Sequence, residues 1–395
     1  MPGPPIFRRD LHFDILIVGA GLAGASLAAA LRRSPYRIGL IDGRAPGPAP
    51  AGWDSRVYAV SPSSQRFLQD LGTWRHLDAA RLTPVHDMAI RGDAGGRIDF
   101  SAWDSGVDQL AWIVEAGLMQ RELWEGLQRQ DNLTLFCPAQ PQGLEVRRDA
   151  VLLRLTSGEM LQANLAVGAD GADSWLRAQA GLPADTLDYG EMGVVANFEC
   201  ERPHRNTAFQ WFRRDGVLAW LPLPGQRISM VWSTPEAHAG ELLGLDADAF
   251  GRRVAEAGGR RLGAFAAPAA SAAFPLRLVR VPRIVAPRLA LIGDAAHAIH
   301  PLSGHGINLG FADARALVGV LLSQAATGDC GDERLLRRYA RARAEEVALL
   351  QWTTHGLQRL FRPAHPAVSL IRNLGLNLAD SLPVVRNMLV RYALG

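Results

Sequence analysis

Residues 14–24 (DILIVGAGLAG) constrain the fold of this chain more than any other part of the sequence. Residues 15–18 form a short, continuous apolar run, which is typical of a strand buried on both faces of a parallel sheet. Residues 25–31 have the pattern of a helix. The strand leads into three glycines with the spacing G-x-G-x-x-G, namely Gly19, Gly21 and Gly24. A strand, a glycine turn and a helix in this order predict the first unit of a parallel α/β fold.

The spacing of these glycines predicts a phosphate-binding turn. The first glycine permits the tight bend, the second lets the backbone approach a pyrophosphate, and the third allows close packing of helix on strand. The helix N-terminus adds free N–H groups and a partial positive charge. A second apolar strand, residues 38–41, ends at Asp42, about 20 residues on, where a ribose hydroxyl needs an acceptor. We therefore expect a bound dinucleotide; the alternative is a strand–helix–strand unit with incidental glycines.

Length, charge and cysteine content narrow the class of protein. The chain has 395 residues, enough for two domains or one elaborated domain, and its net charge of +3 does not indicate a nucleic-acid partner. Cys137, Cys200 and Cys330 are scattered and odd in number, which fits neither a disulfide framework nor a zinc site and favours a reducing cytosol.

The N-terminus resembles a twin-arginine export signal, because Arg8 and Arg9 precede an apolar run. Asp14 at the edge of that run argues against export, and a cleaved signal would discard the glycine turn. No apolar run in the sequence is long and clean enough to span a membrane. The sequence therefore predicts a cytoplasmic protein.

Loops, helices and strands alternate through the rest of the N-terminal half. Residues 43–52 hold too much proline and glycine for regular structure and predict a long loop, which is followed by Asp54-Ser55-Arg56. We expect a helix over residues 61–71 with Ser61 or Ser63 as its N-cap, and a hairpin over residues 88–100. The other expected elements are a helix over residues 115–127 and strands over residues 151–155 and 165–167.

A different texture begins near residue 190. Short β-like runs recur between turn residues, at 194–198, 208–212, 218–221 and 228–232, and residues 237–261 predict a helical insert. We interpret this region as a largely antiparallel sheet laid against the first domain. A buried strand at residues 289–292 returns the chain to the dinucleotide domain, and residues 335–360 predict a long helix.

The segment GDAAHAIHPLSGHGINLG follows the strand at residues 289–292. Asp294 would stand at the carboxyl end of that strand, where open α/β sheets bind ligands, and its carboxylate could accept hydrogen bonds from ribityl hydroxyls. The compatible alternative for Asp294 is a helix N-cap. Further on, two glycines would let the backbone press against a flat ring, and a helix that starts at Asn308 would stabilise negative charge on a reduced flavin.

Together these motifs resemble those of the flavin-dependent aromatic hydroxylases of the para-hydroxybenzoate hydroxylase superfamily, and most of all the polyprenyl-phenol hydroxylases of ubiquinone biosynthesis (the UbiH/UbiF/VisC type). The matches cover nearly the whole chain in order. They are the glycine turn, Asp42, Asp54-Ser55-Arg56, the helix VEAGLMQRELWEGL with Gln120, Asp170-Gly171 with Ser174 and Arg177, and residues 293–310. Weaker matches are Pro203-His204, residues 216–223, Tyr339 with Arg343, and residues 372–375.

The resemblance implies FAD as the cofactor and NAD(P)H as a transient cosubstrate. The implied FAD-binding residues, from the ADP half to the flavin ring, are Gly19, Ala20, Gly21, Gly24, Asp42, Arg56, Gln120, Asp170, Asp294, Gly304, Gly306, Ile307 and Asn308. Asp42 stands where Glu is more usual, and His305 stands where Gln is common. If the His305 side chain faces the ring, it adds a group that titrates near physiological pH.

The implied fold is α/β: a Rossmann-like FAD-binding domain with an inserted, mainly antiparallel β-sheet substrate domain and C-terminal helices. The expected boundaries are 1–182 and 283–330 for the FAD-binding domain, 183–282 for the substrate domain and 331–395 for the C-terminal helical region. Residues 357–394 mix apolar residues and arginines, which suits peripheral docking on the inner membrane or on a quinone-biosynthesis complex. The alternative is that their apolar face packs on the FAD-binding domain.

The resemblance implies an FAD-dependent monooxygenase that hydroxylates a hydrophobic aromatic substrate, a polyprenyl phenol, using NAD(P)H and O2 through a C4a-hydroperoxyflavin. The alternatives are another aromatic hydroxylase or a prenyl reductase of the same fold, and a flavin-bearing subunit of a biosynthetic complex without turnover of its own. A flavin-dependent halogenase is disfavoured, because the W-x-W-x-x-[IP] signature is absent. The sequence identifies no catalytic side chain.

Histidine and tryptophan residues near these motifs leave further alternatives. His297, His300 and His305 do not indicate a metal site, because carboxylates and cysteines with ligand spacing are missing around them. His300 is either a catalytic base or a structural histidine bonded to backbone. Trp211, Trp220 and Trp232 are interpreted as sheet and core residues, with the lining of a substrate cavity as the alternative.

Overall fold

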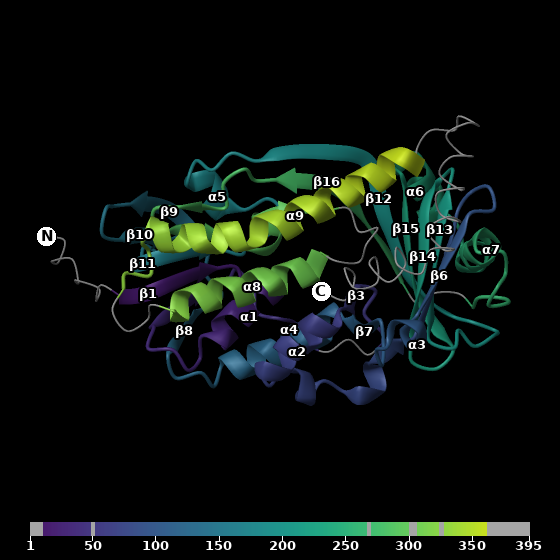
Figure 1. Cartoon of the computed structure of the whole chain (residues 1–395), viewed down its shortest axis with the longest axis horizontal. Coiled ribbons are helices and arrows are strands. Elements are labelled where there is room, and N and C mark those ends of the chain that lie inside the picture. The colour runs from purple at the N-terminus through teal and green to yellow at the C-terminus, as the bar shows by residue number, and fades with distance from the viewer. Residues whose placement is uncertain (1–10, 49–51, 267–269, 300–305, 324–327, 362–395) are drawn as a thin grey trace, which may run out of the picture.

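The computed structural model describes residues 11–48, 52–266, 270–299, 306–323 and 328–361. Its strands form two eight-stranded sheets and one three-stranded sheet. In Figure 1 the first sheet lies toward the N-terminal end of the molecule and the second stands at the opposite end. Helices cover both sheets, and the longest of them runs from one sheet to the other.

The first sheet contains the predicted dinucleotide unit. β1 (Leu11–Val18) lies between β2 (Ile38–Ile41) and β11 (Met160–Gly168) and is parallel to both. Ile15, Leu16 and Ile17 have no exposed surface, as expected for a strand covered on both faces. The remaining strands of this sheet are β8 (Leu133–Phe136), β9 (Pro141–Val146), β10 (Val151–Leu155), β17 (Val285–Ala286) and β18 (Leu289–Leu291).

The second sheet is antiparallel except for one pair of neighbouring strands. Its strands, in spatial order, are β19 (His297–Ala298), β16 (Ser271–Arg280), β12 (Asp185–Glu199), β15 (Arg227–Pro235), β14 (Gly216–Leu223), β13 (Thr207–Arg213), β5 (Asp87–Arg91) and β6 (Arg97–Ser101). The parallel pair is β5 with β13. The predicted hairpin over residues 88–100 is β5 and β6, and it extends this sheet rather than the first one.

The small third sheet faces the second one. It consists of β3 (Val57–Val60), β7 (Ala111–Glu115) and β4 (Thr83–Val85), with β7 in the centre. One face carries Ile113 and Val85, which pack with Ala208 and Leu223 of the second sheet into a common apolar cluster. The third sheet therefore packs on the second sheet through one apolar face.

The α-helices are α1 (Leu22–Ala30), α2 (Pro62–Asp70), α3 (Ala102–Ser105), α4 (Ala116–Leu127), α5 (Trp175–Gln179), α6 (Glu236–Leu243), α7 (Ala247–Ala257), α8 (Gly306–Leu322) and α9 (Glu333–Phe361). Short 3-10 turns are η1 (Trp74–His76), η2 (Ala79–Arg81) and η3 (Gly293–Ala295). None of the helices within the described ranges combines the length and apolar character needed to cross a bilayer.

The long helix α9 fastens the two large sheets to each other. In its first half the Tyr339 hydroxyl donates to the carbonyl of Leu291 in β18 at 2.8 Å. In its second half the Gln351 amide donates to the carbonyl of Val279 in β16 at 3.1 Å, and Gln358 donates to Glu191 in β12 at 2.9 Å. Figure 1 shows this helix running along the molecule over both sheets.

The α/β fold class is as predicted, and local signals placed most of its elements. The helix predicted over residues 61–71 is α2, and the Ser61 hydroxyl caps it by accepting from the Ser64 N–H. The helical insert predicted over residues 237–261 is two helices, because Gly244 is the C-cap of α6 and Asp246 caps α7. The part of the predicted docking segment that follows Phe361 lies outside the described residues.

The three tryptophans belong to the core on the outer face of the second sheet. Trp220 and Trp232 have no exposed surface, and Trp211 packs with them in a cluster that includes α6 and α7. Alternate residues of the same strands point to the opposite face. Asn197 lies on that opposite face, where its amide reaches the Asp54 carbonyl. The structure therefore favours the core role over the cavity-lining alternative.

Candidate functional site

The first glycine turn has the geometry that only glycine allows. Gly19 has φ +102°, and a Cβ at this position would overlap the carbonyl oxygen of Ala169. A Cβ on Gly24 would overlap the carbonyl oxygen of Gly19, so α1 packs directly on the turn. At Gly21, by contrast, no described atom outside its chain neighbours lies within 4 Å of where a Cβ would stand. The space beside Gly21 is therefore open to a ligand.

The N-terminus of α1 faces this space without a side-chain cap. Gly21 is the N-cap residue and has no side chain with which to bond the first N–H groups of the helix. Two polar side chains hold the turn from neighbouring elements. The Asp42 carboxylate, at the end of β2, accepts from the Ala20 N–H at 2.7 Å, and the Gln120 amide of α4 donates to the Ala20 carbonyl. This combination suits the binding of a pyrophosphate.

The second predicted helix start is the N-terminus of α8. Apart from its chain neighbours and its own helix, the described residues place no atom within 4 Å of a Cβ position at Gly306. The Asn308 amide donates to the Ala59 carbonyl at 2.8 Å and accepts from the Ser61 N–H at 3.0 Å, so it joins α8 to β3. Ile307 packs on the core of the first sheet. Gly304, His300 and His305 lie outside the described residues.

Small residues bring the two helix starts together. The Ala23 Cβ of α1 lies 3.1 Å from the ideal Cβ position of Gly293 in η3 and 3.3 Å from that of Gly310 in α8. A larger side chain at either glycine would push the elements apart. The α1 turn, the η3 turn and α8 therefore meet at one junction, which places two helix N-termini and Asp294 around a common site.

Asp294 follows Gly293 in the η3 turn at this junction. Its side chain reaches solvent, although Gly293 and Ala295 on either side are buried. Burial by the surrounding protein raises the pKa of Asp294, while the positive charges of His297 and Arg56 act in the opposite direction. A carboxylate of this kind can accept hydrogen bonds from ligand hydroxyls.

A clamp that the sequence reasoning missed fixes the segment that carries Arg56. Glu115 is 1% exposed; its carboxylate accepts from the Asp54 N–H at 2.5 Å and forms an ion pair with Arg81 at 2.6 Å. The Asn197 amide of β12 donates to the Asp54 carbonyl at 2.9 Å. The acidic residue that ends the apolar strand β7 was the signal that could have identified this clamp.

Asp170 forms hydrogen bonds to the start of α5, the helix that follows it. Its carboxylate accepts from the Ser174 hydroxyl at 2.5 Å and from the Leu176 N–H at 3.0 Å, which fixes the first turn of α5. The neighbouring Ala169 forms the floor under Gly19. Asp170 thus holds α5 next to the glycine turn. Its contact with a dinucleotide stays a prediction, and so do the FAD contacts expected for the other site residues.

The chemistry of these groups fits a dinucleotide that carries a flavin. The N-terminus of α1, which has no side-chain cap, can face the pyrophosphate, and the N-terminus of α8 can face the flavin ring. Asp42 stands at the ribose end of β2, and Asp294 can meet ribityl hydroxyls. Among the described residues, no three His, Cys, Asp or Glu side chains gather as a metal-ligand set.

Comparison with known proteins agrees with this geometry. The profile of the protein family described as "FAD binding domain" matches residues 12–353. The chain belongs to this family. It is 32% identical to the 3-demethoxyubiquinol 3-hydroxylase of Escherichia coli (97% of this chain, 98% of the relative). It is 33% identical to the ubiquinone hydroxylase UbiL of Rhodospirillum rubrum (100% of this chain, 92% of the relative).

The solved structures show the same fold at lower sequence identity. The p-nitrophenol 4-monooxygenase PnpA of Pseudomonas putida superposes with a TM-score of 0.79 at 18% identity, over 98% of this chain and 99% of that one. The family and the hydroxylase relatives identify this chain as an FAD-dependent monooxygenase. When FAD is bound, it supplies the redox chemistry, and the protein supplies binding, orientation and electrostatics.

The two glycines of the first turn give a matched test of the cofactor site. Gly21→Val should leave the fold intact, because its new side chain enters open space, but should abolish FAD retention by occupying the pyrophosphate position. Gly24→Val should lose both the fold and FAD retention, because its Cβ overlaps the Gly19 backbone. Flavin content by absorbance and the near-UV circular dichroism of each variant separate the two effects. A Gly21→Val protein that keeps one FAD per chain would contradict this placement.

Proposed function

We propose that this enzyme hydroxylates the aromatic ring of a polyprenyl phenol in ubiquinone biosynthesis, with NAD(P)H as the electron donor and O2 as the oxidant. The full-length similarity to two hydroxylases whose names refer to ubiquinol or ubiquinone supports this substrate class. The division into an FAD-binding domain (1–182 and 283–330), a substrate domain (183–282) and a C-terminal helical region (331–395) is part of the proposal.

The structural observation that carries the proposal is an apolar wall next to the expected position of the flavin ring. Val57 and Ala59 of β3 and Leu221 of β14 pack around the buried cluster between the third and second sheets. The Ala59 carbonyl is also the acceptor for Asn308 at the start of α8. A hydrophobic phenol held against such a wall would lie beside the ring and out of water, which hydroxylation requires.

The residues that we propose for the dinucleotide site have separate tasks. Gly21 and Gly306 leave room for phosphate and ring at the two helix N-termini, and Asp294 orients the ribityl chain. Arg56, held by the Glu115 clamp through Asp54, offers a positive charge to the pyrophosphate or to a visiting NAD(P)H.

Lipid analysis of a strain that lacks the gene tests the proposed substrate. The deletion should accumulate a polyprenyl phenol that lacks one ring hydroxyl, because the enzyme that consumes it is missing, and should lose the quinone, because the next step has no substrate. The wild-type gene should restore the quinone, and the Gly21→Val gene should not. A deletion strain with unchanged quinones and no accumulated phenol would contradict the substrate assignment but not the FAD site.

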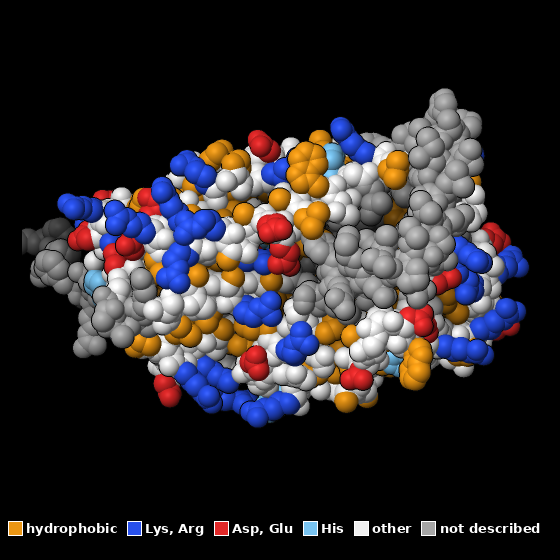
Figure 2. All heavy atoms as spheres, in the orientation of Figure 1, with side chains coloured by type: hydrophobic (Ala, Val, Ile, Leu, Met, Phe, Trp, Pro, Cys, Tyr) orange, Lys and Arg blue, Asp and Glu red, His pale blue; other side chains and the backbone are white. Residues whose placement is uncertain are grey.

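We also propose that the enzyme associates peripherally with a membrane or a membrane-bound complex, through the exposed face of α9. Trp352 and Leu349 are 67% and 47% exposed in its second half, and the Arg280 guanidinium lies 5.1 Å from the Trp352 ring centre. Figure 2 shows basic side chains gathered over the first half of this helix. These exposed residues are Arg334, Arg337, Arg338 and Arg341. An apolar patch beside basic residues suits an anionic bilayer surface.

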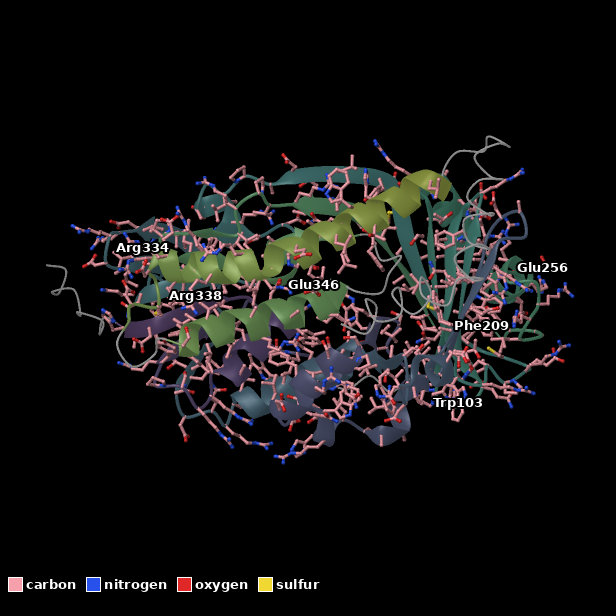
Figure 3. The ribbon with its side chains drawn as sticks, in the orientation of Figure 1. Trp103, Phe209, Glu256, Arg334, Arg338 and Glu346 are labelled. Carbon is pink, nitrogen blue, oxygen red and sulfur yellow. The ribbon has the colours of Figure 1, made fainter. Side chains whose placement is uncertain are left out.

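Flotation with anionic liposomes tests the α9 face. Replacing Leu349 and Trp352 together with Ser should reduce the floated fraction severalfold, because the apolar anchors are lost while the basic residues remain. Trp103→Ser is the matched control, since Trp103 is 90% exposed on α3 and lies far from α9 in Figure 3. Equal flotation of the wild type and the double variant would contradict a membrane role for this face.

A further inference from the structure

A buried charge cluster lies directly beneath the Gly293–Asp294 turn, and the resemblance to known hydroxylases gave it no role. Its centre is Asp313 of α8, which has no exposed surface. Asp313 forms ion pairs with His297 of β19 and with Arg343 of α9, each at 2.7 Å. His297 and Arg343 are only 3% and 4% exposed. One carboxylate therefore joins three elements that are distant in sequence.

The same carboxylate holds the backbone of the flavin-site turn. The Gly293 N–H donates to Asp313 Oδ2 at 2.9 Å. Gly293 has φ +59°, a left-handed conformation that favours glycine, and the Ala23 side chain leaves little room for a Cβ there. Asp294 follows immediately, so the bond from Gly293 to Asp313 fixes the direction in which the Asp294 side chain leaves the backbone.

The cluster also connects the turn to the second sheet. His297 pairs through its backbone with Arg280 of β16, at the edge of that sheet. Arg343 has a second partner in Glu346, which Figure 3 marks in the middle of α9. The start of α8 lies about two helical turns before Asp313, within the same rigid element. Asp313 lies on α8 and thus bonds to three other elements: η3, β19 and α9.

Asp313 and His297 each stabilise the charged form of the other. Burial opposes the charged form of both groups, yet the attraction between them prevails, so the pKa of Asp313 is lowered and that of His297 is raised. Buried ion pairs add little stability compared with apolar packing of the same volume. Stability alone is therefore a weak reason for this cluster, whereas the orientation of a ligand-binding turn needs a strong and directional acceptor.

We propose that Asp313 is a positioning residue for the flavin: its carboxylate, held by His297 and Arg343, sets the Gly293–Asp294 turn so that Asp294 meets the ribityl chain. This inference rests on the assignment of Asp294 to the flavin, which is part of the proposal above, and not on the identity of the phenol. Asp313 acts through the turn and does not touch the cofactor.

This role is tested by comparing how a variant changes the dissociation constants of FAD and of ADP; a change for FAD alone is called the split below. ADP carries only the half of the cofactor that lies on the α1 turn. Asp313→Asn should raise the FAD dissociation constant of the full-length apoprotein at least about tenfold and leave that of ADP unchanged, because only the ribityl end is misplaced. The side chain keeps its size, Arg343 keeps Glu346, and His297 can lose its proton, so the variant is expected to fold. Asp294→Asn should show the same split.

Two further variants complete the test. Asp329→Asn removes the carboxylate partner of another buried arginine, Arg288, on the far side of β18, and should leave both affinities unchanged. If Asp313→Asn does not fold, His297→Gln replaces it, since Asp313 then retains Arg343 and Gly293; a smaller split in the same direction is expected.

Equal weakening of FAD and ADP in Asp313→Asn, or in His297→Gln where it serves as the substitute, would overturn the proposal and show a general structural role. Unchanged FAD affinity in the same folded variant would overturn it too. Neither result depends on the substrate, so the proposed function is tested separately by the lipid analysis.

Discussion

The contact of Ala23 with Gly293 and Gly310 is the constraint on which the rest of the site depends. At 3.1 and 3.3 Å from the two Cβ positions, this methyl group leaves little room for a side chain at either glycine. The close approach aligns α1 with α8 and sets the η3 turn between them. The N-termini of α1 and α8 then face one region, which an elongated ligand with a phosphate at one position and an electron-accepting ring at the other can occupy.

Hydrogen bonds from α9 and from the Glu115 clamp hold the elements around this junction in place. The second sheet contributes an apolar surface beside it. α9 bonds to β18 through Tyr339 and to β16 and β12 through Gln351 and Gln358, so the two sheets have a fixed relation. The Glu115 clamp does the same for the Arg56 segment, which it holds between the third sheet and β12. The proposed flavin side of the enzyme is thus polar and glycine-rich, and the side that faces the second sheet is apolar, as the proposed hydroxylation of a hydrophobic phenol needs.

The sequence predicted the parts of this arrangement that depend on local patterns. The glycine spacing placed Gly19, Gly21 and Gly24, the apolar runs placed β1, β2 and β11, and a serine N-cap placed α2. Long-range pairing was beyond such signals: the register that attaches β5 to β13 depends on contacts between residues more than a hundred positions apart. The ion pairs of Asp313 and Glu115 were missed because a single acidic residue next to apolar residues does not indicate which distant residue it pairs with. The tryptophans of the second sheet needed the strand register before their face could be assigned.

The FAD affinity of Ala23→Val tests the central claim that one cofactor bridges two helix starts held together by small residues. The added methyl groups must push α1 away from Gly293 and Gly310, whereas Ala30→Val, at the other end of α1, is a control that does not touch the junction. We predict that Ala23→Val raises the FAD dissociation constant by about tenfold or more, with the fold retained and the control near wild type. A folded Ala23→Val protein that binds FAD as tightly as the wild type would contradict the account.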